Sequence, residues 1–226
     1  YTSGNKTMIE KICELEPGHA AEFDVNKGKL RIWRWYDFVE QRTEEKIDYE
    51  KLDNIIFQAV KTHLISDVPL GIQLSGGIDS SILAWYVSKI RKDDVKSFSI
   101  TLPDSKFDES KEASETAKKF NFEHYEIPFT IKDFIEIWPK AIKFFDEPIN
   151  HPHTLALFKL YQVAKNHVKV LLSGEGADEV FLGYEHHKKS LNIDNFEELR
   201  DFDKFLDYDI IKKFLNLDFV KKKEDY

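Results

Sequence analysis

The first part of the chain shows the two-residue alternation of β-strands. Residues 20–25, AAEFDV, and 30–35, LRIWRW, are rich in apolar and aromatic side chains. Residues 26–29 between them read NKGK, a composition typical of a tight turn. We therefore expect a β-hairpin near the start of the sequence.

The period of the pattern changes after Glu44. Apolar side chains then recur at i, i+3 and i+4, the spacing of one face of an amphipathic helix. The positions on that face are Leu52, Ile55, Ile56, Ala59, Val60, His63 and Leu64. We expect a helix that buries this face and ends before Asp67.

Beyond Asp67, short apolar runs alternate with longer amphipathic stretches. The runs predict strands at 68–74, 95–102, 123–129 and 168–174. The stretches between them predict helices at 79–91, 109–120, 132–145 and 154–166. Strands that alternate with helices favour a parallel sheet covered on both faces. The predicted fold class is therefore α/β, a doubly wound parallel sheet preceded by a short β-hairpin.

Composition limits the functions that this fold could serve. With 226 residues, of which 42% are hydrophobic, the chain can bury a sizeable core. A net charge of -8 argues against nucleic acid or an anionic membrane as a partner. A single cysteine, Cys13, excludes an internal disulfide framework and suits a reducing compartment. No apolar run reaches the roughly 20 residues of a membrane span, so we expect a cytoplasmic protein.

Two turns stand out because each follows a predicted strand. Residues 75–81 read SGGIDSS and residues 173–179 read SGEGADE. Both turns are rich in Ser and Gly, and both place an aspartate after the glycines, Asp79 and Asp178. Ligands of open α/β sheets bind beyond the carboxyl ends of the strands. We expect the two turns to lie side by side at that edge.

The residue types of the first turn suit a phosphate-bearing ligand. Gly76 and Gly77 let the backbone approach a ligand closely, and the following amides open a helix N-terminus that favours an anion. The hydroxyls of Ser75, Ser80 and Ser81 add donors. The carboxylate of Asp79 would repel phosphate unless a cation lay between them. A Mg²⁺ ion shared with Asp178 would remove that conflict.

The alternative for the first turn is structural: a tight connection in which Asp79 only caps the next helix. Two common nucleotide motifs, GxxxxGK[ST] and GxGxxG, are absent. A P-loop NTPase or a Rossmann dehydrogenase is therefore disfavoured.

Both turns resemble motifs of one enzyme family. SGGIDSS resembles the pyrophosphate-binding loop of the ATP pyrophosphatase (PP-loop) superfamily, and LSGEGADEVFLGY, 172–184, is similar to a signature of the glutamine-hydrolysing asparagine synthetases. The resemblance extends from residue 67 to about 187, and residues 9–38 resemble the hairpin and linker that end the family's glutaminase domain. It implies an adenine nucleotide α-hydrolase-like sheet. It also divides the chain into a hairpin and linker, 1–43, and an ATP-binding domain, 44–226, with an incomplete C-terminal helical lobe.

The resemblance implies that a carboxylate is adenylated by MgATP and that ammonia then displaces AMP to give an amide, as in amino-acid biosynthesis. Carried over by position, the pyrophosphate would be held by Ser75, Gly76, Gly77, Asp79, Ser80 and Ser81, and the adenosine by Gln73, Ile100, Ser173 and Gly174. Asp79 and Asp178 would hold Mg²⁺. Glu175 would take a proton from the attacking ammonia; its alternative role is to cap a helix.

Several positions depart from the family pattern. The family's glutaminase begins with a catalytic cysteine, whereas residue 1 here is Tyr1, so we expect ammonia to come from a glutaminase domain outside this chain. Residues 190–226 have a helical pattern without a recognisable counterpart of the family's catalytic lysine. Leu182 replaces a signature glycine. His151 and His153 stand where an acidic run is common and would bind an acidic group or cap the next helix.

Two functions remain open at this level. The first is an ATP-dependent, AMP-forming ligase that acts on aspartate or a related acid such as a sugar acid. The second is an adenine-nucleotide-binding fragment or degenerate homologue without turnover. A homodimer is compatible with either function.

Overall fold

The computed structural model describes residues 5–37, 46–91, 95–103, 105–146, 148–149 and 151–184. The chain forms two compact units, Tyr1–Gly174 and Glu175–Tyr226. The helical pattern predicted for 190–226 and the domain boundary predicted at residues 43 and 44 lie outside the described residues.

The expected hairpin is present. Strands β1 (His19–Asp24) and β2 (Lys29–Arg34) pair antiparallel and form a two-stranded sheet. The Asp24 carboxylate accepts hydrogen bonds from the backbone amides of Asn26 and Lys27, each 3.0 Å long, which closes the turn. Gly28 completes the turn with a φ of +61°, a conformation that glycine adopts readily.

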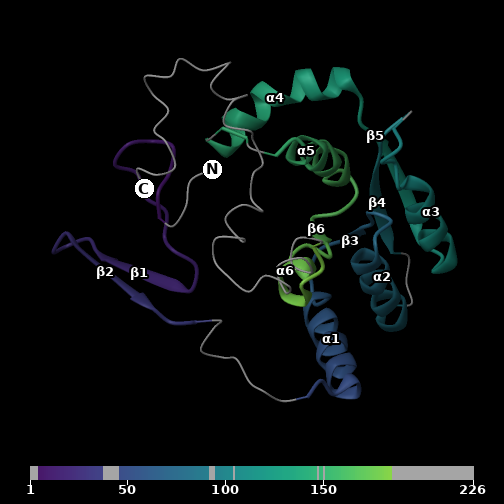
Figure 1. The fold of residues 1–226 in the computed structure, drawn as a ribbon, viewed down its shortest axis with the longest axis horizontal. Helices are drawn as coiled ribbons and strands as arrows, with labels where there is room; N and C mark the ends of the chain where they lie inside the picture. Colours follow the sequence, from purple (N-terminus) through teal and green to yellow (C-terminus); the bar gives the residue numbers. More distant parts are fainter. Residues whose placement is uncertain are drawn as a thin grey trace, which may run out of the picture. The chain divides into compact units, whose positions relative to one another are not determined.

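The other four strands form one parallel sheet (Figure 1). They are β3 (Leu70–Gln73), β4 (Lys96–Thr101), β5 (Glu123–Pro128) and β6 (Val170–Leu172), in the order β5-β4-β3-β6. All three strand pairs are parallel, which confirms the predicted fold class. The chain moves outward from β3 to β5 and then returns to place β6 on the other side of β3. The order therefore reverses between β3 and β6, the place where sheets of this kind bind ligands.

Helices cover both faces of the parallel sheet (Figure 1). The helices α1 (Tyr49–His63), α2 (Ile78–Ile90) and α3 (Ser110–Lys119) pack on one face. On the other face α5 (His153–Ala164) packs on β4 and β5, and α4 (Ile131–Phe145) packs on α5. No helix among the described residues is both long enough and apolar enough to cross a membrane.

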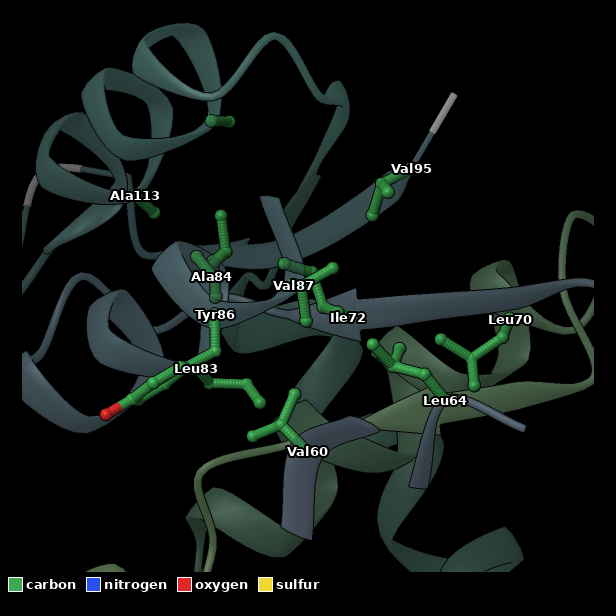
Figure 2. Close-up of a cluster of buried hydrophobic side chains, with 12 residues drawn as sticks. Val60, Leu64, Leu70, Ile72, Leu83, Ala84, Tyr86, Val87, Val95 and Ala113 are labelled. Carbon is green, nitrogen blue, oxygen red and sulfur yellow. The ribbon is translucent and has the colours of Figure 1, made fainter. Parts of the chain in front are cut away.

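The main core lies between β3 and the first three helices (Figure 2). Ile72 of β3 and Leu74, the residue that follows the strand, are almost fully buried. Val60 of α1 and Leu64, the C-cap residue of this helix, pack in the same cluster. The buried face of α1 differs from the predicted one: Ile55 is 57% exposed and His63 is also exposed. The helix turns the row through Ile56, Val60 and Leu64 inward because β3 and α2 lie only on that side.

His124, Ser97 and Ser99 form a polar cluster on one face of the strands β4 and β5. His124 of β5 contacts the hydroxyl of Ser97 through Nδ1 at 2.8 Å and that of Ser99 through Nε2 at 3.2 Å. Both serines are buried. Burial lowers the pKa of His124; the carboxylate of Glu126 acts in the opposite direction, and the ammonium of Lys118 adds to the lowering.

The described part of the second unit, residues 175–184, contains one short helix, α6 (Ala177–Phe181), which the sequence did not predict. It begins after Gly176, with a φ of +88°, and ends at Leu182, with a φ of +56°. Leu182 thus adopts a left-handed conformation that favours glycine, and this costs about 1 kcal/mol for a residue with a Cβ.

Candidate functional site

The turn after β3 is held closed by its own serines. Leu74 anchors it because the Leu74 amide donates to the Phe98 carbonyl at 2.9 Å. The hydroxyl of Ser80, which is buried, accepts from the Ser75 amide at 3.2 Å and donates to the Gly77 carbonyl at 3.1 Å. Ser80 therefore fixes the shape of the turn from inside, while Ser75 is exposed.

Gly76 is the residue at which the turn reverses direction. Its φ is +85°, and a Cβ at this position would lie 2.6 Å from the carbonyl oxygen of Glu109. A side chain is therefore excluded both by the backbone conformation and by the neighbouring start of α3. The turn therefore packs directly against the start of α3.

Helix α2 begins at this turn without a side-chain cap. Gly77 is its N-cap residue, and no side chain accepts from the amides of the first turn. Such amides favour an anion, since a helix leaves the N–H groups of its first turn without intrahelical partners. Asp79 lies in the first turn and is half-buried, and the Ser81 hydroxyl donates back to the Gly77 carbonyl at 2.9 Å. The predicted structural alternative, in which Asp79 caps α2, is not observed.

The loop after β6 meets the start of α2. Strands β3 and β6 are direct neighbours, and a Cβ on Gly174 would lie 3.2 Å from Cβ of Asp79 and 3.2 Å from the amide nitrogen of Ser80. The expectation that the two loops lie side by side is thus confirmed as far as Gly174. Ser173, next to it, is exposed.

Gln73 and Ile100, the expected adenosine residues, share the sheet face covered by α5. Gln73 pairs with Phe98 in the register of β3 and β4, and paired residues of parallel strands point to one face. Phe98 and Ile100 both belong to the hydrophobic cluster under α5. The hydroxyl of Tyr161, on α5, donates to Oε1 of Gln73 at 3.4 Å. Nothing in the sequence pattern predicted this contact with Tyr161.

The acidic residues that follow belong to the second unit. Glu175 is exposed and Asp178 is half-buried on α6. Gly176 is the N-cap of α6 and no side chain caps this helix, so the alternative role of Glu175 as a cap is not observed. Since Asp79 belongs to the first unit, a cation shared by Asp79 and Asp178 stays a prediction.

The chain after α6 folds back onto these acids. A Cβ on Gly183 would lie 1.9 Å from Oδ1 of Asp178. The hydroxyl of Tyr184 donates to Oε1 of Glu179 at 2.7 Å, and this bond, together with burial and the nearby carboxylates, raises the pKa of Tyr184 to about 12. Neither contact could be foreseen from the spacing of the signature. Because Gly183 has no side chain, the side chain of Asp178 can occupy this space.

His151 and His153 lie together at the start of α5. Their ring centroids are 5.4 Å apart and both residues are exposed. The N-cap residue of α5 is Pro152, and no side-chain bond caps the helix. The predicted capping role of the histidines is therefore not observed.

The donor set of the first unit fits a phosphate with its metal. The amides of an uncapped helix start and of two glycines, with the hydroxyl of an exposed serine, can donate hydrogen bonds to phosphate oxygens. Asp79 adds a carboxylate of the kind that binds Mg²⁺. No group of three or more His, Cys, Asp or Glu side chains able to hold a metal occurs among the described residues. A metal ion beside Asp79 would need further oxygen ligands from the phosphates of a bound nucleotide, as is usual for Mg²⁺.

Two proteins with similar sequences are described as asparagine synthetases. Asparagine synthetase (glutamine-hydrolyzing) 1 of Bacillus subtilis is 33% identical over 196 residues, which are 85% of this chain and 30% of that protein. Asparagine synthetase B (glutamine-hydrolyzing) of Escherichia coli is 32% identical over 184 residues, 74% of this chain and 32% of that protein. The chain thus spans about a third of the length of these relatives.

Among solved structures, a glutamine-dependent NAD+ synthetase from Acinetobacter baumannii in complex with adenosine diphosphate aligns with a TM-score of 0.45 at 20% identity. The alignment covers 73% of this chain and 31% of that one.

The asparagine synthase family model matches residues 51–224. The matched range includes the turn after β3, the loop after β6 and the acidic helix α6. This chain belongs to the asparagine synthase family.

Proposed function

We propose that this chain is the synthetase part of an ATP-dependent, AMP-forming ligase that converts a carboxylate into an amide. One observation carries most of the proposal: the uncapped start of α2 and the loop after β6 meet at the switch point of the sheet, with Gly174 against Asp79. Family membership supports the same reading, because the relatives named above are asparagine synthetases.

In the proposed reaction, a carboxylate oxygen of the acid attacks the α-phosphorus of ATP. The bond from that phosphorus to the bridging oxygen breaks, and pyrophosphate leaves. Ammonia then attacks the acyl carbon, the bond to the AMP oxygen breaks, and the amide and AMP are released. The balance is one acid, one ATP and one ammonia to one amide, one AMP and one pyrophosphate.

Different residues of the chain would bind the pyrophosphate group, the metal ion and the adenosine. Ser75, Gly76, Gly77 and Ser81 would bind the pyrophosphate group, with Ser80 holding the turn in shape. Asp79 and Asp178 would hold Mg²⁺, which would offset negative charge on the phosphates. Gln73, Ile100, Ser173 and Gly174 would line the adenosine site.

Glu175 is proposed as the group that accepts a proton from the attacking ammonia. Glu175 is exposed, and no side-chain hydrogen bond caps α6. A general base must lie within hydrogen-bond reach of the proton that it removes. Its place next to Gly174 in the sequence supports this assignment.

The test is pyrophosphate release from MgATP with ammonium and a panel of carboxylic acids. The panel should hold aspartate, other diacids and sugar acids, because His151 and His153 offer two imidazoles for a second acidic group. Acid-dependent release of pyrophosphate with equal formation of AMP supports a ligase. Nucleotide binding without release for any acid supports the alternative, a binding fragment or degenerate homologue.

A further inference from the structure

Asp108 joins the end of strand β4 to the start of helix α3. One carboxylate oxygen, Oδ1, accepts from the Leu102 amide at 3.0 Å and from the Ser110 amide at 3.4 Å. The other, Oδ2, accepts from the Ser110 hydroxyl at 2.8 Å. Leu102 follows β4 directly and Ser110 is the first residue of α3. Three bonds to one side chain therefore fix the distance between these two elements.

The carboxylate of Asp108 supplies a hydrogen-bond acceptor that the N-terminus of α3 otherwise lacks. The N-cap residue of α3 is Glu109, and its side chain makes no capping bond. Asp108, one position earlier, accepts from the first amide of the helix in its place. These bonds, with the Leu102 amide first, hold the pKa of Asp108 below its usual value, so the side chain carries a negative charge near neutral pH.

The start of α3 is also the wall against which the glycine-rich turn packs. A Cβ on Gly76 would lie 2.6 Å from the carbonyl oxygen of Glu109, 2.9 Å from its Cβ and 3.2 Å from Cβ of Glu112. Gly76, which has a φ of +85°, lies directly against these atoms, and they support the turn from that side. A shift of Glu109 would remove that support.

We infer that Asp108 is a positioning residue for the pyrophosphate-binding turn: through Glu109 it sets the place of Gly76, and thereby the direction of the amides that open α2. The inference rests on the proposed function for the identity of the ligand. The geometry of the turn is independent of it.

Binding of MgATP and of AMP to the full chain of 226 residues separates positioning from general stability. Asp108→Ala removes all three bonds and should weaken MgATP about tenfold or more, since hydrogen bonds to a charged group are among the stronger ones. AMP has no pyrophosphate and should lose much less affinity. Asp108→Asn keeps an oxygen for the Leu102 amide and should restore most of the MgATP affinity.

Ser105→Ala is the matched control. It removes a solvent-exposed hydrogen bond of the same loop, in which the Phe107 amide donates to the Ser105 hydroxyl at 3.1 Å. This variant leaves the hydrogen bonds of Asp108 intact. Its MgATP affinity should equal that of the wild type. Unchanged MgATP affinity in Asp108→Ala would overturn the inference. So would equal losses for MgATP and AMP, because these indicate general destabilisation.

A second measurement needs no nucleotide. The backbone amide resonances of Gly76 and Gly77 should shift in Asp108→Ala and stay in place in Ser105→Ala. Resonances that do not move in Asp108→Ala refute the positioning role. If the wild type binds neither nucleotide, the proposed function fails for this chain, and the resonances still decide whether Asp108 positions the turn.

Discussion

Gly174 lies directly against Asp79, with only 3.2 Å between the place of a Gly174 Cβ and Cβ of Asp79. The two residues are 95 positions apart in the sequence and belong to the loops that follow β6 and β3. The absence of a side chain at Gly174 is what lets these loops approach. The contact places the predicted adenosine loop beside the predicted pyrophosphate turn.

Replacing Gly174 by Ala should weaken nucleotide binding. The new methyl group would press on backbone atoms of Asp79 and Ser80, which cannot turn aside as a flexible side chain could. Overpacking of this kind costs about 1–3 kcal/mol, which corresponds to at least about a fivefold loss of MgATP affinity if the turn moves to relieve it. Calorimetric titration with MgATP measures the loss.

Gly28→Ala is the control for Gly174→Ala. No atom lies within 4 Å of a Cβ at Gly28, and the hairpin turn is not part of the proposed site. This variant should lower the stability of the hairpin by about 1 kcal/mol because of its positive φ, and leave MgATP affinity unchanged. Equal affinities for Gly174→Ala and the wild type would show that the contact with Asp79 does not shape the site.

The sequence predicted most of the elements because each has a clear period or a clear turn. The predicted strand 123–129 and helix 79–91 differ from β5 and α2 by one residue at their ends. The four strands were correctly expected to be parallel, since helices separate them. The order of the strands could not be derived, because nothing in the local pattern says that β6 returns to the side of β3.

The hydrogen bonds of particular side chains were the part that sequence reasoning missed. Asp108 occurs in a short acidic run, and only the fold shows that it connects Leu102 to Ser110. Similarly, Ser80 was expected to donate to a ligand, whereas its buried hydroxyl closes the turn on itself. Residue type suggests which bonds a side chain can make, and packing selects among them.

Asp79→Asn should weaken MgATP far more than AMP. The substitution keeps the size of the side chain and removes the charge that would hold Mg²⁺. Loss of an outer-sphere partner of a metal typically costs about 10- to 100-fold in affinity, and loss of a direct ligand should cost at least as much. Calorimetry with MgATP and with AMP gives the two values, and Glu115→Gln, an exposed position on α3, controls for the change in net charge. Equal losses for both ligands would contradict a metal role for Asp79.

Gly183→Ala should disturb the carboxylate of Asp178. The added methyl group would lie 1.9 Å from Oδ1, so either the Asp178 side chain or the backbone must move. If Asp178 binds Mg²⁺, the Mg²⁺ concentration that gives half-maximal ATP binding should rise about tenfold or more. Gly176→Ala is the matched control in the same segment, because no atom lies within 4 Å of its Cβ and it tests only the strain of a positive φ. An unchanged Mg²⁺ requirement in Gly183→Ala would count against Asp178 as a ligand.

His124 should make the stability of the fold depend on pH. Its two ring nitrogens contact the buried hydroxyls of Ser97 and Ser99, and burial lowers its pKa in the folded state from the ordinary value of 6.5. The unfolded chain therefore binds a proton at a higher pH than the folded chain does. The contribution of His124 is fully present above pH 6.5 and is lost as the pH falls from there toward the lower pKa of the folded state.

Urea unfolding of the wild type and of His124→Gln at pH 8 and pH 5 tests this dependence. At pH 8 the imidazole is neutral in both states, so the difference between the two proteins measures the bonds to the serines, about 1–3 kcal/mol if their hydroxyls lose their partner. Between pH 8 and pH 5 the wild type should lose more free energy of unfolding than His124→Gln, because only the wild type carries this titrating group. The carboxylate of Glu126 would limit the effect by favouring the protonated ring, and Glu126→Gln should therefore increase the acid sensitivity of the wild type. Parallel pH profiles for the wild type and His124→Gln would show that the ring takes up its proton equally in the folded and unfolded states.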